Sequence, residues 1–376
     1  MCGDAHNAGE TNRKLIREGE TRMGQLSPTP HGEQSPYEGS VATQSVFTWL
    51  LGMPVSIAMQ EAVRLGIPDL LDAGPKHVAV LASTVNVDTR TLLLLLRALA
   101  SVDVFQEIAE EVFAQTVFSA ILRADLPGSL FALARVLGTS WCRASLANLA
   151  STLETGHPSF ETFFQKDLHA YLSEHPEEQH LFRQTLALFS EPLIADVVRT
   201  YDFSTVGTLV DIGSGDGSFL ITVLKQYPSL QGLLLSLPPQ IEDARLAIEQ
   251  AGLAQRCTCL EGNFFEGVPV GADVYFLQQI LRGWNDEQCV QLLSNCGKAM
   301  ATGGRVLVAE YVIPRPPHKP SPVLFIGLWM SLLRPGGYER TETQLRTLCE
   351  RAGLSVVRMW ATSSAYSLLE AKKAGT

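Results

Sequence analysis

The spacing of hydrophobic residues divides the chain into two parts. From about Ser45 to Leu186, apolar residues recur every three to four positions, which is the spacing of an amphipathic α-helix. From about Asp202, short β-prone runs alternate with helical stretches. The pattern therefore predicts a helical N-terminal part followed by an α/β part.

A winged-helix arrangement is predicted within the helical part. The segment "HVAVLASTVNVDTRTLLLLLRALASVDVF" (77–105) indicates helix, turn and helix, with Asp88 as the N-cap of the second helix. Two β-prone runs, "VFQEI" (104–108) and "VFAQT" (112–116), follow as a small hairpin. The second helix has five consecutive leucines and little polar surface for base edges, which favours a packing or dimerisation role over DNA binding.

The α/β part is predicted to form a doubly wound sheet that ends in an antiparallel hairpin. The hairpin strands are "SVVRMWAT" and "AYSLLEA", joined by "SS". The expected fold is thus α/β, preceded by an α-rich winged-helix domain. The five candidate parallel strands are "TLVDI", "GLLLSL", "TCLEGNF", "ADVYFL" and "RVLVAEYV".

Composition at the N-terminus predicts a disordered tail over residues 1–40, because this stretch is rich in Gly, Glu, Ser, Pro and Asn and has no signal-peptide pattern. The winged-helix domain is expected over 41–150, a helical linker over 151–200 and a ligand-binding domain over 201–376. The longest apolar stretch, 323–333, is shorter than the ~20 residues that a membrane span needs. We expect a cytoplasmic protein with no membrane partner.

Charge and cysteine content argue against a nucleic-acid-binding surface, a disulfide framework and a cysteine metal site. The formal net charge of −10 argues against a nucleic-acid partner, because phosphate binding needs a basic face. Seven scattered cysteines favour reduced thiols over a disulfide framework. Cys257 and Cys259 form an isolated CxC in a predicted strand, so core packing explains them better than a metal site.

A glycine-rich loop, "LVDIGSGDGSFL" (209–220), lies between a predicted strand and a predicted helix. Glycines at such a turn let a ligand approach the backbone and the free N–H groups of the helix. A dinucleotide fingerprint would need a third glycine where Ser218 stands. Asp211, before the loop, would repel a pyrophosphate but suits a cationic group, so the pattern favours S-adenosylmethionine as the cofactor.

Six motifs in order resemble those of small-molecule O-methyltransferases that use S-adenosylmethionine, including the plant caffeate, animal acetylserotonin and bacterial polyketide-tailoring types. The resemblance runs from about residue 45 to 372. It implies a class I methyltransferase fold, an aromatic or polyketide-like substrate, and a homodimer formed through the winged-helix domain. The motifs are "VDIGSGDG", "LPP", "EGNFFEGVPVGADVYFL", "ILRGWNDEQC", "GGRVLVAEYVIP" and "GGYERTETQLRTLCERAGL".

The resemblance also implies a set of cofactor-binding residues. Ser236 stands where the family has an acidic residue for the ribose hydroxyls, and it supplies a hydrogen bond but no charge. Asn263 replaces the aspartate beside the adenine amino group and retains a carbonyl acceptor. Gln278 precedes the catalytic segment, where the family often has a lysine. The full cofactor set is Asp211, Gly213, Gly215, Ser236, Leu237, Asn263, Phe264 and Gln278.

The family's catalytic segment reads L-H-x-W, and its histidine removes a proton from the substrate hydroxyl. Here the segment is Leu281 to Trp284 with Arg282 at the histidine position, and arginine stays protonated. The two acidic partners of that histidine correspond to Glu310 and Glu339. We expect the guanidinium group to lie between both carboxylates, in fork geometry.

Several roles for Arg282 follow. Methyl transfer without a base is possible if Arg282 holds an already ionised acceptor. Alternatively, the protein binds S-adenosylmethionine but performs hydroxylation-type, cyclisation or pericyclic chemistry, with Arg282 as hydrogen-bond donor. Two further interpretations are that Arg282 forms only a structural ion pair, and that the protein is a non-catalytic binding partner.

Substrate contacts are expected from the helical linker and the stretch after residue 320, although core packing is the simpler account of any one of these side chains. His169 is the best candidate for a displaced base because aromatic residues flank it. The predicted pocket residues are Trp141, His169, Trp284, Trp329 and Met330.

Overall fold

A computed structural model describes residues 41–375 except 214, 238–239, 315–321 and 363–365. These residues belong to two compact units that divide between Ser56 and Ile57. The described part of the first unit contains helix α2 (Val41–Leu50) and the start of α3 (Gly52–Arg64). The predicted tail over 1–40 lies outside the described residues, and the predicted domain boundaries remain predictions.

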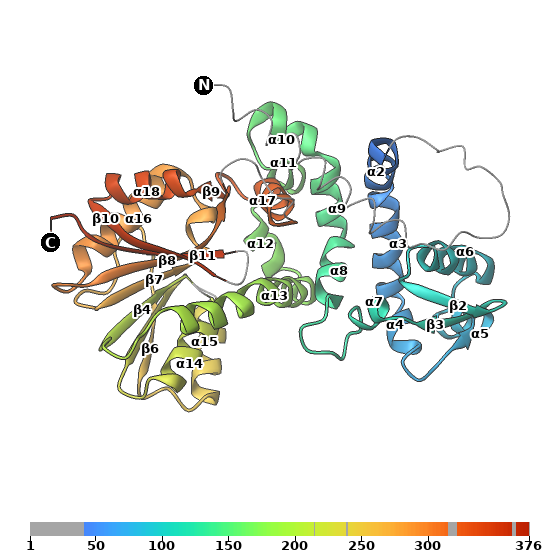
Figure 1. The fold of residues 1–376 in the computed structure, drawn as a ribbon, viewed down its shortest axis with the longest axis horizontal. Coiled ribbons are helices and arrows are strands. Elements are labelled where there is room, and N and C mark those ends of the chain that lie inside the picture. Colours follow the sequence, from blue (N-terminus) through green and yellow to red (C-terminus); the bar gives the residue numbers. More distant parts are fainter. Residues whose placement is uncertain (1–40, 214, 238–239, 315–321, 363–365, 376) are drawn as a thin grey trace, which may run out of the picture. The chain divides into compact units, whose positions relative to one another are not determined.

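The winged-helix prediction is confirmed in the second unit (Figure 1). Helices α5 (Val78–Val85) and α6 (Thr89–Ala100) precede a hairpin of β2 (Phe105–Ala109) and β3 (Val112–Gln115). Asp88 caps α6 as predicted, since its Oδ1 accepts the backbone N–H of Thr91 at 2.8 Å. A third strand, β1 (Lys76–His77), pairs with β3.

The leucine-rich helix α6 is packed against the hairpin. Leu92, Leu96 and Leu99 are buried in one cluster with Phe105 and Phe113 of the two hairpin strands. The apolar stripe of α6 therefore belongs to the core of this domain, as its spacing predicts.

Short helices and one long helix connect the winged helix to the sheet. Several of these helices share a core that contains Trp141, which has no exposed surface and packs edge-on against Phe160 and Phe182. The connecting helices are α7 (Val117–Ala120), α8 (Phe131–Leu137), α9 (Ser140–Ala147), α10 (Leu149–Thr155), α11 (Ser159–Phe164), α12 (Leu168–Ser173) and α13 (Pro176–Thr200). Helix α4 (Ile67–Leu70) precedes the winged helix and packs in its core.

The C-terminal part is a doubly wound sheet with strand order β10-β11-β8-β7-β4-β5-β6. All five predicted parallel strands form, and the last two strands pair antiparallel as predicted. The residues that join this hairpin lie outside the described residues. The strands are β4 (Thr208–Ile212), β5 (Gln231–Ser236), β6 (Cys257–Glu261), β7 (Val274–Gln278), β8 (Arg305–Ile313), β10 (Leu354–Ala361) and β11 (Tyr366–Lys373).

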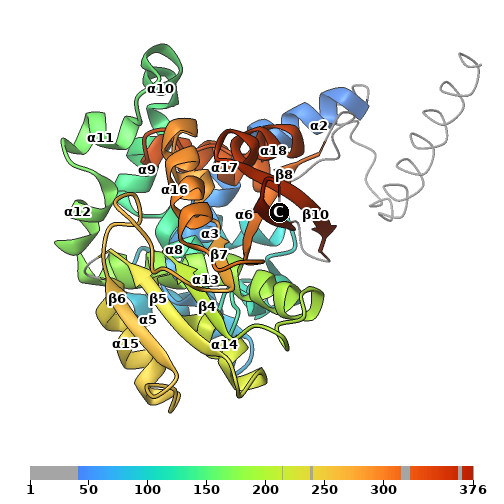
Figure 2. The ribbon, with the colours of Figure 1, turned by 90° about the vertical axis from the view of Figure 1, so that its left-hand side faces the viewer.

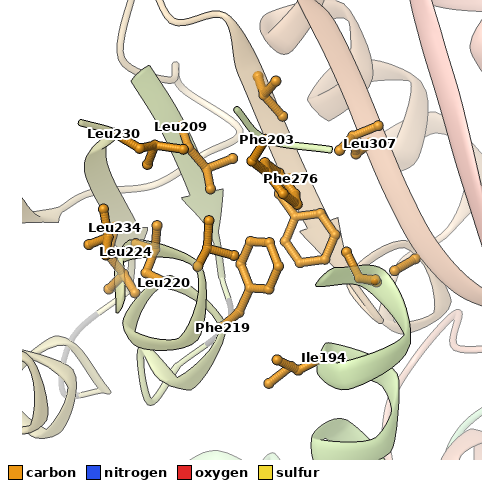
Figure 3. Close-up of a cluster of buried hydrophobic side chains, with 14 of the residues drawn as sticks. Ile194, Phe203, Leu209, Phe219, Leu220, Leu224, Leu230, Leu234, Phe276 and Leu307 are labelled. Carbon is orange, nitrogen blue, oxygen red and sulfur yellow. The ribbon is translucent and has the colours of Figure 1, made fainter. Parts of the chain in front are cut away.

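Helices cover both faces of this sheet (Figure 2). Helices α13, α14 (Ser218–Gln226) and α15 (Gln240–Gln250) pack on one face, and α16 (Asp286–Ala299) and α18 (Glu342–Arg351) pack on the other. Figure 3 shows the first of these cores, where Phe219 of α14 stacks on Phe276 of β7 with ring centroids 3.8 Å apart. Both faces are apolar, so the strands are continuous hydrophobic runs.

Candidate functional site

The order of the strands creates a switch point at the carboxyl end of β4. The chain runs from β4 to β5 and β6 on one side, then returns to place β7 on the other side of β4. Ligands of doubly wound proteins bind where the strand order reverses in this way. The glycine loop follows β4 directly, so the loop and the switch point coincide.

Backbone geometry explains the glycines in this loop. Gly213, Gly215 and Gly217 all have positive φ, between 72° and 79°, a region that side chains rarely adopt. A Cβ atom on Gly213 would lie 2.9 Å from Ile280 Cδ1 and 3.5 Å from the Phe264 ring. The loop therefore lies close to two other segments that the family resemblance assigned to the site.

Polar side chains are buried at the ends of three neighbouring strands. Asp211 of β4 and Ser236 of β5 have no exposed surface, and Gln278 ends β7. The Oε1 atom of Gln278 is buried and accepts no hydrogen bond from the described residues. A buried acceptor without a donor is costly, so a ligand with an N–H or O–H group here would satisfy it.

Asn263 begins the turn after β6. Its Oδ1 accepts the backbone N–H of Phe265 at 3.0 Å, and its Nδ2 donates to Glu266. An amide oxygen has two lone pairs, so one remains for the adenine amine that the sequence analysis anticipated. Phe264 is buried against the glycine loop, and Leu237 is partly buried. The eight predicted cofactor residues thus belong to the loop, to strand ends around the switch point or to the segments beside them, and the site fits a nucleoside with a cationic end.

Arg282 lies in a short 3-10 helix, η1 (Leu281–Gly283), which follows β7. Its Nη1 is 3.1 Å from Oε1 of Glu339, and the two side chains are only 10% and 4% exposed. Glu339 precedes β9 (Arg340–Thr341), which pairs with β8 and so brings Glu339 beside the strand that carries Glu310.

The prediction that one guanidinium group bridges both carboxylates is wrong. Glu310 Oε1 instead accepts the backbone N–H groups of Leu281 and Arg282, at 2.7 and 3.3 Å. These N–H groups open η1 and have no carbonyl acceptor within it, so the buried carboxyl group supplies one. Arg282 therefore forms its ion pair with Glu339 alone among the described residues.

Both carboxyl groups have raised pKa values. Burial, and then the charge of Glu339, raise the pKa of Glu310 to about 8 against the opposing effect of Arg282. Burial likewise raises the pKa of Glu339, although Arg282 opposes the change. Glu310 is thus protonated at neutral pH, and the ion pair of Arg282 and Glu339 carries no net charge when both are ionised.

Arg340 anchors the candidate catalytic segment, a role that sequence analysis missed. Its side chain is 2% exposed and donates to the carbonyl oxygens of Leu281 and Trp284, both at 2.8 Å. It also pairs with Asp286, at the start of α16. The available signal was its position beside Glu339 in the "GGYERTE" motif.

The predicted pocket residues divide between two clusters. Trp284 packs edge-on against Phe265, with centroids 4.8 Å apart, and so belongs with the cofactor-side aromatics. Trp141 and Trp329 are buried in the helical core, and Met330, on α17 (Pro322–Leu333), packs against that core. His169 is partly buried on α12, and no contact of its side chain joins it to Arg282 among the described residues.

Two family matches cover most of the chain. Residues 146–355 match the O-methyltransferase domain, and residues 47–125 match the O-methyltransferase dimerisation domain. The first match alone spans more than half of the chain. The winged-helix and sheet regions described above thus correspond to the two parts of one known architecture.

Individual relatives support the same assignment. Mitomycin biosynthesis 6-O-methyltransferase of Streptomyces lavendulae is 36% identical over 320 residues, which cover 85% of this chain and 91% of the relative. The structure of the mitomycin 7-O-methyltransferase MmcR is 34% identical and superposes with a TM-score of 0.83, covering 89% and 98% of the two chains. The calicheamicin methyltransferase CalO1, solved with S-adenosylhomocysteine bound, is 32% identical with a TM-score of 0.74, covering 91% and 100%. The chain therefore belongs to the family of S-adenosylmethionine-dependent O-methyltransferases.

Proposed function

We propose that this enzyme transfers a methyl group from S-adenosylmethionine to an oxygen of an aromatic secondary metabolite without using a base at position 282. The observation that carries the proposal is the buried ion pair between Arg282 and Glu339, 3.1 Å apart. A guanidinium group held this way donates hydrogen bonds but accepts no proton.

Position and charge replace the base in this proposal. When bound, S-adenosylmethionine supplies an electrophilic methyl group on a sulfonium. Alignment of the two reactants lowers the activation barrier by about 7–11 kcal/mol. A general base raises the rate by about 10²–10⁴-fold, which is a smaller effect. An acceptor that is already ionised loses no proton during transfer, so alignment suffices.

The remaining site residues are proposed to act in two groups. Glu310 orients η1 through its backbone contacts and, being protonated at neutral pH, is no base there. Aromatic and apolar side chains bound the acceptor, and the strand-end residues hold the cofactor. The acceptor group is Trp141, His169, Trp284, Trp329 and Met330, and the cofactor group is Asp211, Gly213, Gly215, Ser236, Leu237, Asn263, Phe264 and Gln278.

The relatives named above are methyltransferases, which favours methyl transfer over the non-methylating alternatives. Purified protein, S-adenosylmethionine with a labelled methyl group, and a panel of phenols and aromatic carboxylates test the choice. We expect label in the product of at least one ionised acceptor. An acceptor that is consumed without gaining label would contradict methyl transfer.

Arg282→His provides a second test, with Arg282→Gln as the matched control. The histidine variant regains a base, so methylation of neutral phenols should rise toward the ~10²–10⁴-fold range of general-base catalysis. The glutamine variant should gain nothing, because it lacks both base and charge. Equal rates in wild type and both variants would exclude a role for position 282.

A further inference from the structure

Arg334, beside the candidate catalytic segment, has a cationic side chain that forms no ion pair within the described part of the chain. The residue directly follows α17, and its backbone N–H donates to the carbonyl oxygen of Met330 at 3.1 Å, which extends the helix. The side chain is partly buried. Among the residues that the structure describes, none forms an ion pair or hydrogen bond with its guanidinium group.

Backbone packing places Arg334 next to Arg282. A Cβ atom on Gly337 would lie 3.1 Å from the carbonyl oxygen of Arg282 and 3.8 Å from that of Arg334. Gly327 is seven positions before Arg334 and so on the same helix face, and a Cβ atom added there would lie 2.9 Å from Cγ of Glu339. The face of α17 that carries Arg334 therefore borders the ion pair of Arg282 and Glu339.

The charges at this site do not balance. Glu339 compensates Arg282, and Glu310 is protonated at neutral pH. Burial lowers the pKa of Arg334, the charge of Asp167 opposes this change, and the charge of Arg282 lowers the pKa by a smaller amount. A partly buried cation without a partner is unfavourable, and an anion bound beside it offsets that cost.

We propose that Arg282 and Arg334 together bind an oxyanion, a carboxylate or an ionised phenol, carried by the methyl acceptor. This inference rests on the proposed function and specifies the acceptor as an aromatic anion. Two guanidinium groups offer planar donors suited to carboxylate oxygens, and they hold the acceptor in its ionised form. The bound oxygen is either the one that receives the methyl group or a second acidic group beside it.

Binding of two flat probes of equal shape tests the site. 2-Naphthoate and 2-naphthamide differ only in charge and are titrated calorimetrically into the full chain, with and without S-adenosylhomocysteine. Wild type should bind the naphthoate about tenfold or more tightly, as charge-assisted hydrogen bonds imply. Equal affinities, or no naphthoate binding, would overturn the proposal.

Variants assign the preference to Arg334. Arg334→Gln should remove most of the preference for naphthoate while leaving naphthamide affinity within about twofold, and Arg334→Lys should retain part of it because the charge remains. Arg346→Gln, on α18 and paired with Glu342, is the control and should match wild type. An unchanged preference in folded Arg334→Gln protein would contradict the assignment, and so would its loss in Arg346→Gln.

Turnover of 3-hydroxy-2-naphthoate shows whether the bound anion is the oxygen that receives the methyl group or a second acidic group of the acceptor. Attack by the carboxylate breaks the S–CH₃ bond, leaves its electron pair on sulfur and gives a methyl ester with no proton to remove. Attack by the phenol oxygen, after its proton has been lost to solvent, breaks the same S–CH₃ bond and gives a methoxy acid, with the carboxylate as anchor. Binding of S-adenosylhomocysteine, titrated alone, tests the proposed function separately, since its failure would not change the naphthoate preference.

Discussion

Glu310 shows how a single residue connects the fold to the site. Its Oε1 atom accepts two backbone N–H groups of η1, whereas its buried Oε2 accepts no hydrogen bond from the described residues. Protonation relieves the cost of burying a charge, which is why burial raises the pKa of Glu310 to about 8. The residue therefore stabilises η1 as a neutral acid.

The raised pKa makes stability depend on pH. Between pH 4.5 and about 8 the unfolded chain ionises Glu310 while the folded chain keeps it protonated, so Glu310 lowers stability as the pH rises through this range. Glu310→Gln is neutral in both states and keeps the acceptor oxygen. Its free energy of unfolding relative to wild type should rise by about 1.4 kcal/mol per pH unit in this window.

Urea unfolding at pH 5.5, 6.5 and 7.5 measures this difference. Glu342→Gln, on the exposed pair of α18, is the control and should show a constant difference from wild type. A constant difference for Glu310→Gln as well would mean that Glu310 is ionised in the folded protein.

The sequence predicted the roles of residues that act on their neighbours in the chain better than the roles of residues whose partners are far away in the sequence. The Asp88 cap and the loop glycines need only neighbouring residues, so their patterns identify them. The backbone N–H groups that donate to Glu310 lie 29 and 28 residues away and meet it only because β7 and β8 are adjacent. That separation is why the sequence predicted a two-carboxylate fork on Arg282.

At the scale of elements, η1 is held in place by Arg340. Two carbonyl oxygens at the ends of the segment accept its guanidinium hydrogens, and β9 positions it beside β8. Strand β9, like β1, contains two residues, too few for an alternating pattern to show. The longer strands were found from their hydrophobic runs, with β4 matched at both ends and the other ends shifted by at most three residues.

Arg340→Met tests this anchor. The substitution keeps an apolar stem but leaves the carbonyl groups of Leu281 and Trp284 with only the weak thiol donor of Cys289, which should cost about 2–4 kcal/mol of stability. The rate of methyl transfer should fall as well, because Arg282 lies between those two residues. Urea unfolding and turnover with labelled cofactor measure both effects, and Arg346→Met is the exposed control. Wild-type stability in Arg340→Met would contradict the anchoring role.

At the scale of the whole molecule, an apolar helical surface near the N-terminus needs a partner. The stretch Thr43–Arg64 has the length and apolar composition of a membrane-crossing helix, and it exceeds the 323–333 run on which the expectation of no membrane partner rested. Trp49, Leu50 and Met53 are 74%, 73% and 69% exposed within one chain. Exposed apolar patches of this kind mark interfaces, and the match to the dimerisation domain begins at residue 47.

A homodimer that buries this surface is the expected assembly. Sedimentation should give twice the 41.0 kDa of one chain, and Leu50→Asp should shift the protein toward the monomer because a buried charge without a partner is costly. Leu246→Asp, at an exposed position of α15, is the matched control and should remain dimeric. A monomeric wild type that floats with lipid vesicles would instead assign the surface to a membrane. A dimer unaffected by Leu50→Asp would place the interface elsewhere on the chain.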